Sequence, residues 1–316
     1  MSLTVLISDP QFSSCPRLPA LEKLLSRADV QPAPEGGLGG MLAQLFGLQA
    51  TTLPIAPLTR LADGGTRDAE FWLRADPVNL VADRDRLLMM PLETLDIQKQ
   101  EAQALADHIN RTYQADGMKL EVLRPSRWYL HVPENPECST HDPADIAGGP
   151  VLHFMPDGPD AARLKRLMNE FQMLLHEHPV NQAREAAGMP PVNGIWLWGG
   201  GRLPDMPRVP QGVITDMPLV RGLAMCAGSE CRQWPITFDS LTASSTNLLA
   251  LTGGDAQALA RIETGFAQAA VELLRRGELS DITVYCGGSH VYRVTRGTLR
   301  RVWRRRRPLA DLVGAI

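Results

Sequence analysis

The chain has few cysteines, and their arrangement argues against a disulfide framework. Its 316 residues include five cysteines, an odd number spread widely along the sequence. Small secreted domains that depend on disulfides carry many more cysteines for their length. Cys226 and Cys231 lie near each other, but no second cysteine or histidine pair follows at the spacing of a structural zinc site. The pattern predicts reduced thiols and a cytoplasmic protein.

The sequence also has no long hydrophobic run and little net charge. No stretch reaches the roughly 18 apolar residues of a membrane-spanning helix. No basic region precedes the short apolar stretch 3–7, so we expect no signal peptide. A formal net charge of −3 gives the whole chain no bias toward nucleic acid or membranes. With 44% hydrophobic residues, the length suits one large or two medium domains with sizeable cores.

Apolar residues recur at helix and strand spacing in alternation, which predicts an α/β protein. Most clearly, Leu164, Leu167, Phe171 and Leu175 would line one face of a helix over 160–176. Further helices are expected over 18–28, 41–48, 94–113 and 253–276, and one from Pro179. Strands are expected over 3–8, 119–123, 128–132 and 194–198, with a hairpin over 281–294. Residues 59–70 are polar and contain glycine, so they are expected to form a loop.

The segment His176–Gly201, HEHPVNQAREAAGMPPVNGIWLWGGG, carries the most specific signal. It resembles the "HPVN..R" and "N.iWlWG.G" stretch of archaeal-type, cofactor-independent phosphoglycerate mutases, which belong to the alkaline-phosphatase superfamily. Segments 18–29, 71–80, 139–151 and 212–228 are similar to that family in the same order. Three further segments look like the RpfE-type regulatory proteins, a bacterial branch of the family: WLRADPVNLVADRDRL, NEFQMLLHEHPVNQARE and WLWGGGRLP.

The resemblance implies an alkaline-phosphatase-like mixed sheet flanked by helices, with a smaller α+β cap-like subdomain. We expect residues 1–70 and 190–316 to form a degenerate core, and 71–189 to form the cap-like, ligand-binding part.

The metal ligands that such an enzyme needs are hard to find in the sequence. Two divalent ions would require several Asp and His ligands from separate strand ends. Asp9 ends the first strand, where the family has its first ligand, but Pro10 follows instead of a flexible glycine. The family's nucleophile segment and its C-terminal Asp–His metal motif have no counterpart. Asp9 is therefore the one candidate catalytic and metal-binding residue, and a turn cap is its alternative role.

Arginines of the cap-like part match positions that hold substrate in the family. The resemblance places Arg74, Arg127 and Arg184 there, and His178 and Asn181 belong to the same "HPVN" segment as Arg184. Guanidinium groups suit this role because their planar fork grips phosphate and carboxylate groups. Salt bridging, helix capping and turn stabilisation are the structural alternatives.

The C-terminal region contains eight arginines between Arg293 and Arg307. Such a run can bind nucleic acid, an acidic protein face or a membrane surface. Arg300, Arg304 and Arg307 would share one face if the segment were helical. A solvated terminal helix, docked through Trp303 and balanced by acidic surface elsewhere, is the alternative.

Three functional hypotheses follow from these patterns. The first is a non-catalytic regulatory protein without a cofactor, binding a small phosphorylated metabolite through arginines. The second is a phosphoglycerate-mutase-like phosphotransferase with a rearranged Mn or Zn site at Asp9. The third is a protein or nucleic-acid partner module that uses the arginine-rich segment.

Overall fold

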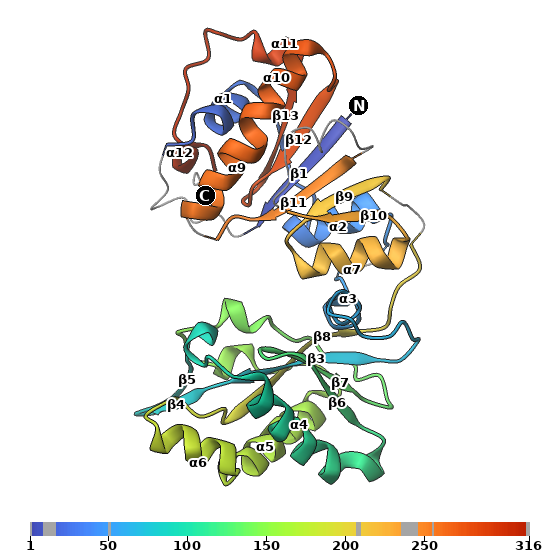
Figure 1. The fold of residues 1–316 in the computed structure, drawn as a ribbon, viewed down its shortest axis with the longest axis vertical. Helices are drawn as coiled ribbons and strands as arrows, with labels where there is room; N and C mark the ends of the chain where they lie inside the picture. Colours follow the sequence, from blue (N-terminus) through green and yellow to red (C-terminus); the bar gives the residue numbers. More distant parts are fainter. Residues whose placement is uncertain are drawn as a thin grey trace. The chain divides into compact units, whose positions relative to one another are not determined.

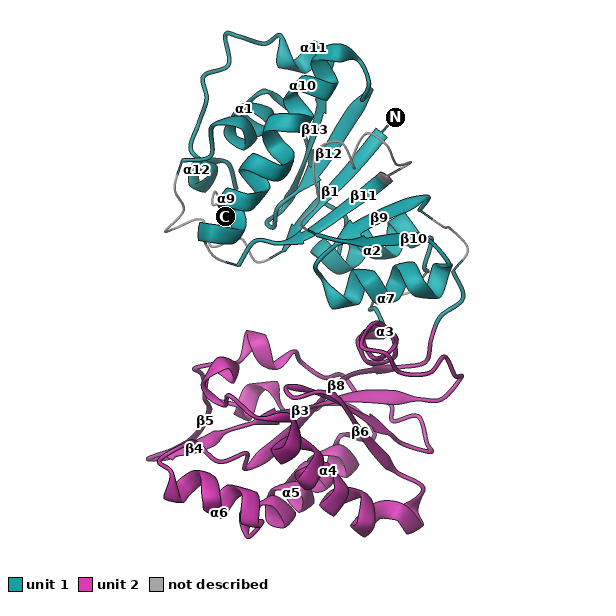
Figure 2. Ribbon diagram, in the orientation of Figure 1, with its two compact units in different colours: residues 1–53, 204–316 teal, residues 54–203 magenta. Residues whose placement is uncertain are grey.

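The chain folds into two compact units, which a computed structural model describes for residues 2–8, 17–49, 52–206, 210–234, 246–254 and 256–313. Unit 1 combines Met1–Leu53 with Pro204–Ile316, and unit 2 is Pro54–Leu203 (Figure 2). The expected ligand-binding part, 71–189, lies within unit 2. This unit also includes residues 54–70 and 190–203, because strand β8 (Gly194–Gly201) pairs with β3 (Trp72–Val78).

Unit 1 is built on a mixed seven-stranded sheet (Figure 1). Its central strand β1 (Ser2–Ser8) is a run of β-branched and aliphatic residues and pairs in parallel on both sides, as strands buried on both faces do. The sheet order is β10 (Glu230–Gln233), β9 (Gly212–Thr215), β11 (Thr246–Thr252), β1, β12 (Asp281–Tyr285), β13 (His290–Thr295), β2 (Asp29–Pro32). Strand β13 runs antiparallel to both of its neighbours, β12 and β2. Its pairing with β12 confirms the predicted hairpin.

Helices surround this sheet: α1 (Pro19–Arg27), α2 (Gly37–Phe46), α7 (Pro218–Ala227), α9 (Ala256–Ile262), α10 (Gln268–Arg276), α11 (Arg296–Leu299) and α12 (Leu309–Val313). A π-helical turn, Glu263–Ala267, joins α9 to α10 within the long helix predicted over 253–276. The buried Glu263 carboxylate accepts hydrogen bonds from the N–H groups of Ala20 and Leu21 at 2.7 and 3.0 Å. It thereby caps α1, which begins with Pro19 and has no side-chain cap of its own.

Unit 2 contains an antiparallel sheet in the order β6 (Lys119–Arg124), β7 (Arg127–His131), β3, β8. A separate hairpin joins β4 (Leu80–Asp83) to β5 (Arg86–Met89). The helices are α3 (Ile55–Ala62), α4 (Lys99–Tyr113), α5 (Ala161–His176) and α6 (Pro179–Ala186). Short 3-10 turns occur at Leu92–Thr94, Gln114–Asp116, Pro143–Asp145 and Leu152–Phe154. The α/β class, with a mixed sheet flanked by helices, is confirmed.

The two faces of the unit 2 sheet differ in chemistry because side chains alternate along each strand. Leu73 and Ala75 of β3 and Leu130 of β7 share one core with apolar residues of α4 and α5. Trp72, Arg74 and Asp76 point to the opposite face, toward α3.

The expected loop over 59–70 is wrong in its first part, because α3 runs to Ala62. Its apolar residues Ala56, Leu58 and Leu61 are buried, and the guanidinium of Arg60 lies 3.7 Å above the Trp72 ring. Arg60 also donates to Glu121 of β6 at 2.8 Å. These contacts fix a short helix whose end was concealed by the polar, glycine-containing sequence that follows it.

Two of the three glycines at the end of β8, Gly199 and Gly201, allow α3 to approach the sheet closely. A Cβ at Gly199 would lie 2.9 Å from the Ile55 Cβ, and one at Gly201 would lie 2.4 Å from the Pro54 Cβ. Gly199 also has a φ of +60°, a left-handed conformation that glycine adopts freely. Gly199 and Gly201 belong to strand β8, and their lack of a side chain lets the start of α3 pack against this strand.

We expect Gly199→Ala to lower the free energy of unfolding by about 2–4 kcal/mol, since a left-handed alanine costs about 1–2 kcal/mol and crowding costs more. Gly188→Ala is the matched control, because Gly188 has a φ of +71° but nothing within 4 Å of its Cβ position. Urea denaturation measures both. Equal losses in the two variants would contradict the packing role of Gly199.

Candidate functional site

The polar face of the unit 2 sheet holds a buried ion pair between Arg74 and Asp76. These residues are two apart on β3 and therefore share one face. Arg74 Nε and Nη2 donate to the Asp76 carboxylate at 3.1 and 2.6 Å, and the Trp198 indole N–H donates to it at 2.7 Å. The guanidinium lies 5.4 Å from the Tyr129 ring and 5.2 Å from the Trp198 ring. Both charged residues are less than a tenth exposed, so neither is stable there without the other.

A second arginine is fixed in the same way on the neighbouring strand. Arg127 Nε and Nη2 donate to Asp63 at 2.7 and 2.6 Å. Tyr129 donates its hydroxyl to Asp63 at 2.7 Å, and Arg124 approaches the same carboxylate at 3.3 Å. Asp63 follows the last residue of α3, so the helix delivers the carboxylate to β7. In the described part of the chain, the Nη1 groups of Arg74 and Arg127 make no hydrogen bond.

Arg74 and Arg127 line one cavity of about 560 Å³. Its walls come from β3, β8, the β6–β7 turn, the segment that contains the 3-10 turn Leu92–Thr94, and the start of the 3-10 turn Pro143–Asp145. The lining consists of Arg74, Asp76, Pro77, Leu92, Glu93, Leu95, Asp96, Ile97, Pro125, Ser126, Arg127, Asp142, Pro143 and Trp198. This volume suits a small metabolite.

Local hydrogen bonds bring Asp142 to this cavity. The Trp196 indole N–H donates to the His141 carbonyl at 2.9 Å, and the Gly199 N–H donates to the Thr140 hydroxyl at 3.1 Å. Both bonds attach the long loop 139–143 to β8. The Asp142 carboxylate then accepts a bond from the Ala144 N–H at 2.9 Å and starts the 3-10 turn.

Burial and hydrogen bonding shift the pKa values of the acids in this region. Burial raises the pKa of Asp76 above its usual value, against the opposing effect of Arg74 and of the Trp198 bond. Burial also raises the pKa of Asp142, and the nearby Asp145 and Asp76 charges add to it. For Asp63, burial is outweighed by the bonds from Arg127 and Tyr129, so its pKa is lowered.

The other residues matched by resemblance lie outside this cavity. Arg184 is buried, and it donates to the Pro190 carbonyl at 2.9 Å, to Glu101 at 2.8 Å and to the Leu95 carbonyl. Because Leu95 lines the cavity, Arg184 supports its wall from behind.

Asn181 and His178 shape the start of α6. The Asn181 amide donates to the Leu175 and Val192 carbonyls at 2.8 Å and accepts from the Val192 N–H at 2.9 Å. His178 is the N-cap of α6, and its Nδ1 accepts from the Val180 N–H at 3.2 Å. Burial and the nearby His108 and Arg111 lower the pKa of His178.

The predicted arrangement of the arginine-rich segment is wrong. Helix α11 ends at Leu299 and α12 begins at Leu309, so Arg300, Arg304 and Arg307 do not share a helix face. The intervening chain is held instead by bonds to α1 and to residues just after it, including Arg304 Nη1 to the Ala28 carbonyl at 2.8 Å. Trp303 is not docked, since it is 74% exposed.

Asp9 lies outside the described residues. Over the described ranges, no group of three or more His, Cys, Asp or Glu residues is placed to hold a metal ion. The four described cysteines are free thiols. No helix that the structure describes is long and apolar enough to cross a membrane.

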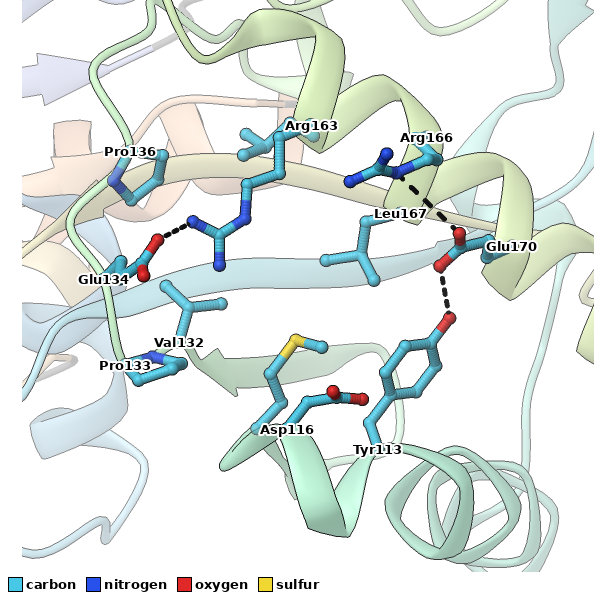
Figure 3. Close-up of a pocket in the computed structure, with 12 residues that line it drawn as sticks. Tyr113, Asp116, Val132, Pro133, Glu134, Pro136, Arg163, Arg166, Leu167 and Glu170 are labelled. Carbon is cyan, nitrogen blue, oxygen red and sulfur yellow. Dashed lines mark hydrogen bonds and ion pairs between the residues drawn. The ribbon is translucent and has the colours of Figure 1, made fainter.

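A second cavity, of about 430 Å³, lies between the end of α4 and the start of α5 (Figure 3). Arg166 pairs with Glu170 at 3.9 Å, Tyr113 donates to Glu170 at 2.7 Å, and Arg163 pairs with Glu134. Sequence reasoning did not find this cavity, since it assigned α5 only a buried apolar stripe.

Comparison with known proteins finds a family-model match that lies within unit 2. Residues 66–181 match the family model described as 2,3-bisphosphoglycerate-independent phosphoglycerate mutase. A Geobacter sulfurreducens protein named a probable mutase of this kind is 34% identical over 174 residues, which cover 52% of this chain and 42% of the relative. A Methanothrix thermoacetophila mutase is 44% identical over 92 residues, or 27% of this chain and 24% of the relative. The matches thus span less than half of these relatives' lengths.

Among solved structures, the PH0037 protein from Pyrococcus horikoshii aligns with a TM-score of 0.54 and 15% identity, covering 93% of this chain and 87% of that one. This likeness shows a shared fold. The sequence matches support a relationship to the phosphoglycerate-mutase-like branch of the alkaline-phosphatase superfamily.

The Asp63 network predicts a specific pH dependence of stability. Because the folded-state pKa of Asp63 is lowered, its contribution is complete above the ordinary value of 3.8 and is lost as pH falls through the folded-state pKa. Urea denaturation between pH 3 and pH 7 should show this loss in the wild type, and Asp63→Asn should weaken it. An identical pH dependence in both proteins would contradict the assignment.

Proposed function

We propose that this protein is a non-catalytic, RpfE-type regulatory relative of the phosphoglycerate mutases, and that the Arg74–Arg127 cavity binds a small phosphorylated or carboxylated metabolite. The observation that carries the proposal is the shared cavity of two arginines from neighbouring strands. The departures from the family's metal motifs around Asp9 and after Gly228 support a role without phosphoryl transfer. The scattered cysteines favour the cytoplasm as its location.

The geometry of the two arginines suits recognition of an anion. Each guanidinium uses its Nε and Nη2 edge on an aspartate, which fixes the plane of the group and the direction of its remaining donors. A phosphate or carboxylate oxygen can then be held by the two Nη1 groups with little further loss of side-chain entropy.

The acidic part of the lining limits which anions fit. Asp76, Glu93, Asp96 and Asp142 face the same cavity as the two arginines. Aspartate partners also cancel much of each arginine's charge, so a highly charged ligand gains little. We therefore propose a ligand with one anionic group and several hydroxyls. The hydroxyls would donate hydrogen bonds to the carboxylates.

Titration calorimetry with hydroxylated monocarboxylic acids and sugar monophosphates, and with the more highly charged 3-phosphoglycerate for comparison, tests this proposal. Arg127→Ala should weaken binding about tenfold or more, because a hydrogen bond to a charged group contributes about 1.5–3 kcal/mol. Arg124→Ala is the matched control: Arg124 also pairs with Asp63, but it does not line the cavity. The affinity of the Arg124→Ala variant for the ligand should stay within about twofold of that of the wild type. Absence of any binding partner in the panel, or equal losses in the two variants, would contradict the proposal.

A metal-dependent phosphomutase is the second candidate, favoured by the names of the relatives that match this chain. Asp9 would then hold Mn²⁺ or Zn²⁺, and the metal would activate a nucleophile and offset phosphate charge. We expect no turnover of 3-phosphoglycerate with either ion. Turnover that requires manganese and disappears in Asp9→Ala, together with bound metal detected by mass spectrometry, would establish the enzyme instead.

A further inference from the structure

The arginine-rich segment of unit 1 uses some of its guanidinium groups to hold itself in place. Arg301 pairs with Asp29, and Arg306 pairs with Glu22 of α1 at 3.4 Å. The backbone N–H of Arg307 donates to the Ser26 hydroxyl at 2.9 Å. The chain between α11 and α12 thus lies against α1 in a fixed, non-helical conformation (Figure 1).

Other side chains of the same segment face solvent without a partner. Across the residues that the structure describes, the guanidinium groups of Arg296, Arg300 and Arg305 form no ion pair or hydrogen bond, and all three residues are exposed. Trp303 and its neighbour Val302 are 74% and 73% exposed. The other five tryptophans of the chain are at most 8% exposed, so Trp303 is exceptional. Exposing an indole costs free energy that a partner could recover.

Neighbouring elements extend the positive charge. Arg27 lies at the end of α1 and donates to the Leu299 carbonyl, and Lys23 lies one turn earlier. Burial and the charges of Arg275 and Arg27 lower the pKa of Lys23, which indicates a positive local potential. Two acids nearby are occupied, since Glu272 pairs with Arg276 and Asp29 with Arg301.

We propose that this arginine–tryptophan surface, formed by Arg296, Arg300, Trp303 and Arg305, binds single-stranded nucleic acid. The three arginines contact phosphate groups, and the Trp303 indole stacks on a base. The surface belongs to unit 1, and the proposal does not depend on a ligand in the unit 2 cavity.

The composition and shape of the surface favour this partner. Residues 291–307 contain eight arginines and no lysine. Arginine recognises individual phosphates through its planar fork, whereas lysine acts as a point charge. An exposed indole offers a stacking platform for an unpaired base, as in proteins that bind single strands. The segment 300–308 has no helix or strand that could enter the major groove of a duplex.

Fluorescence anisotropy of labelled (dT)20 and (rU)20 tests the proposal with the full-length protein. Trp303→Leu should weaken binding roughly five- to a hundredfold, because a stacked base is lost, whereas Trp303→Phe should retain most of the affinity. The triple variant R296A/R300A/R305A should reduce the slope of log K against log[NaCl] by up to about 2. The variant R84A/R86A/R111A removes the same charge from unit 2 and should leave the slope unchanged.

Acrylamide quenching adds a direct readout, because Trp303 is the exposed tryptophan and bound oligonucleotide should shield it.

Vesicles containing phosphatidylserine distinguish a membrane partner, since the Trp303→Leu variant would still insert into a bilayer. Vesicle binding without oligonucleotide binding would overturn the proposal. Equal oligonucleotide affinity in Trp303→Leu, or an unchanged salt slope in the triple variant, would also overturn it.

Discussion

The buried pair of Arg74 and Asp76 is the interaction on which the polar face of unit 2 depends. Removing two charges from water is costly, and the pair is stable only because guanidinium, carboxylate and the Trp198 indole satisfy one another. Alternation along β3 places both charges on one side and leaves Leu73 and Ala75 for the apolar core on the other. One strand therefore supplies both a hydrophobic core and an oriented donor.

A second arginine–aspartate pair, Arg127 with Asp63, occurs on the neighbouring strand β7. Its aspartate comes from the end of α3. Asp63 reaches Arg127 and Tyr129 only because α3 lies close to the sheet, and α3 lies close because Gly199 and Gly201 carry no Cβ. Glycines that lack any reactive group thus determine where a cavity-lining arginine points. The same close approach explains why two of the three residues that follow Trp198 must lack a Cβ.

Much of the fold was predictable because periodicity reports burial. The helix over 160–176, the central strand of unit 1 and the hairpin over 281–294 each have a strong apolar pattern. Helix α3 was missed because Arg60 and Thr59, polar but buried, break its pattern. The spacing of Arg300, Arg304 and Arg307 suggested one helix face, but the segment is not helical, and Arg301 and Arg304 bind Asp29 and the Ala28 carbonyl instead.

The site was predictable only in part. The resemblance identified Arg74 and Arg127. No local sequence pattern predicted that Asp63, Asp76 and Asp142 would lie beside them, since these come from a helix end, a strand and a loop. Spacing offered one hint, since Arg74 and Asp76 stand two apart on an expected strand. Arg184, in contrast, matches the family segment without a gap, yet its three donor groups are directed to Glu101 and two carbonyls. Sequence matching identifies a residue, but only the fold reveals whether its donors remain available.

The two units also differ in whether their arginine side chains are already paired with acids. In unit 2, Arg74 and Arg127 are paired with aspartates, which limits them to ordered, short-range hydrogen bonding. In unit 1, Arg296, Arg300 and Arg305 are unpaired among the described residues, and their field extends to about the Debye length of 8–10 Å. The formal net charge of −3 conceals this difference because it sums over the whole chain. Pairing, not the number of arginines, is therefore the reason why we propose a small metabolite for one surface and a polyanion for the other.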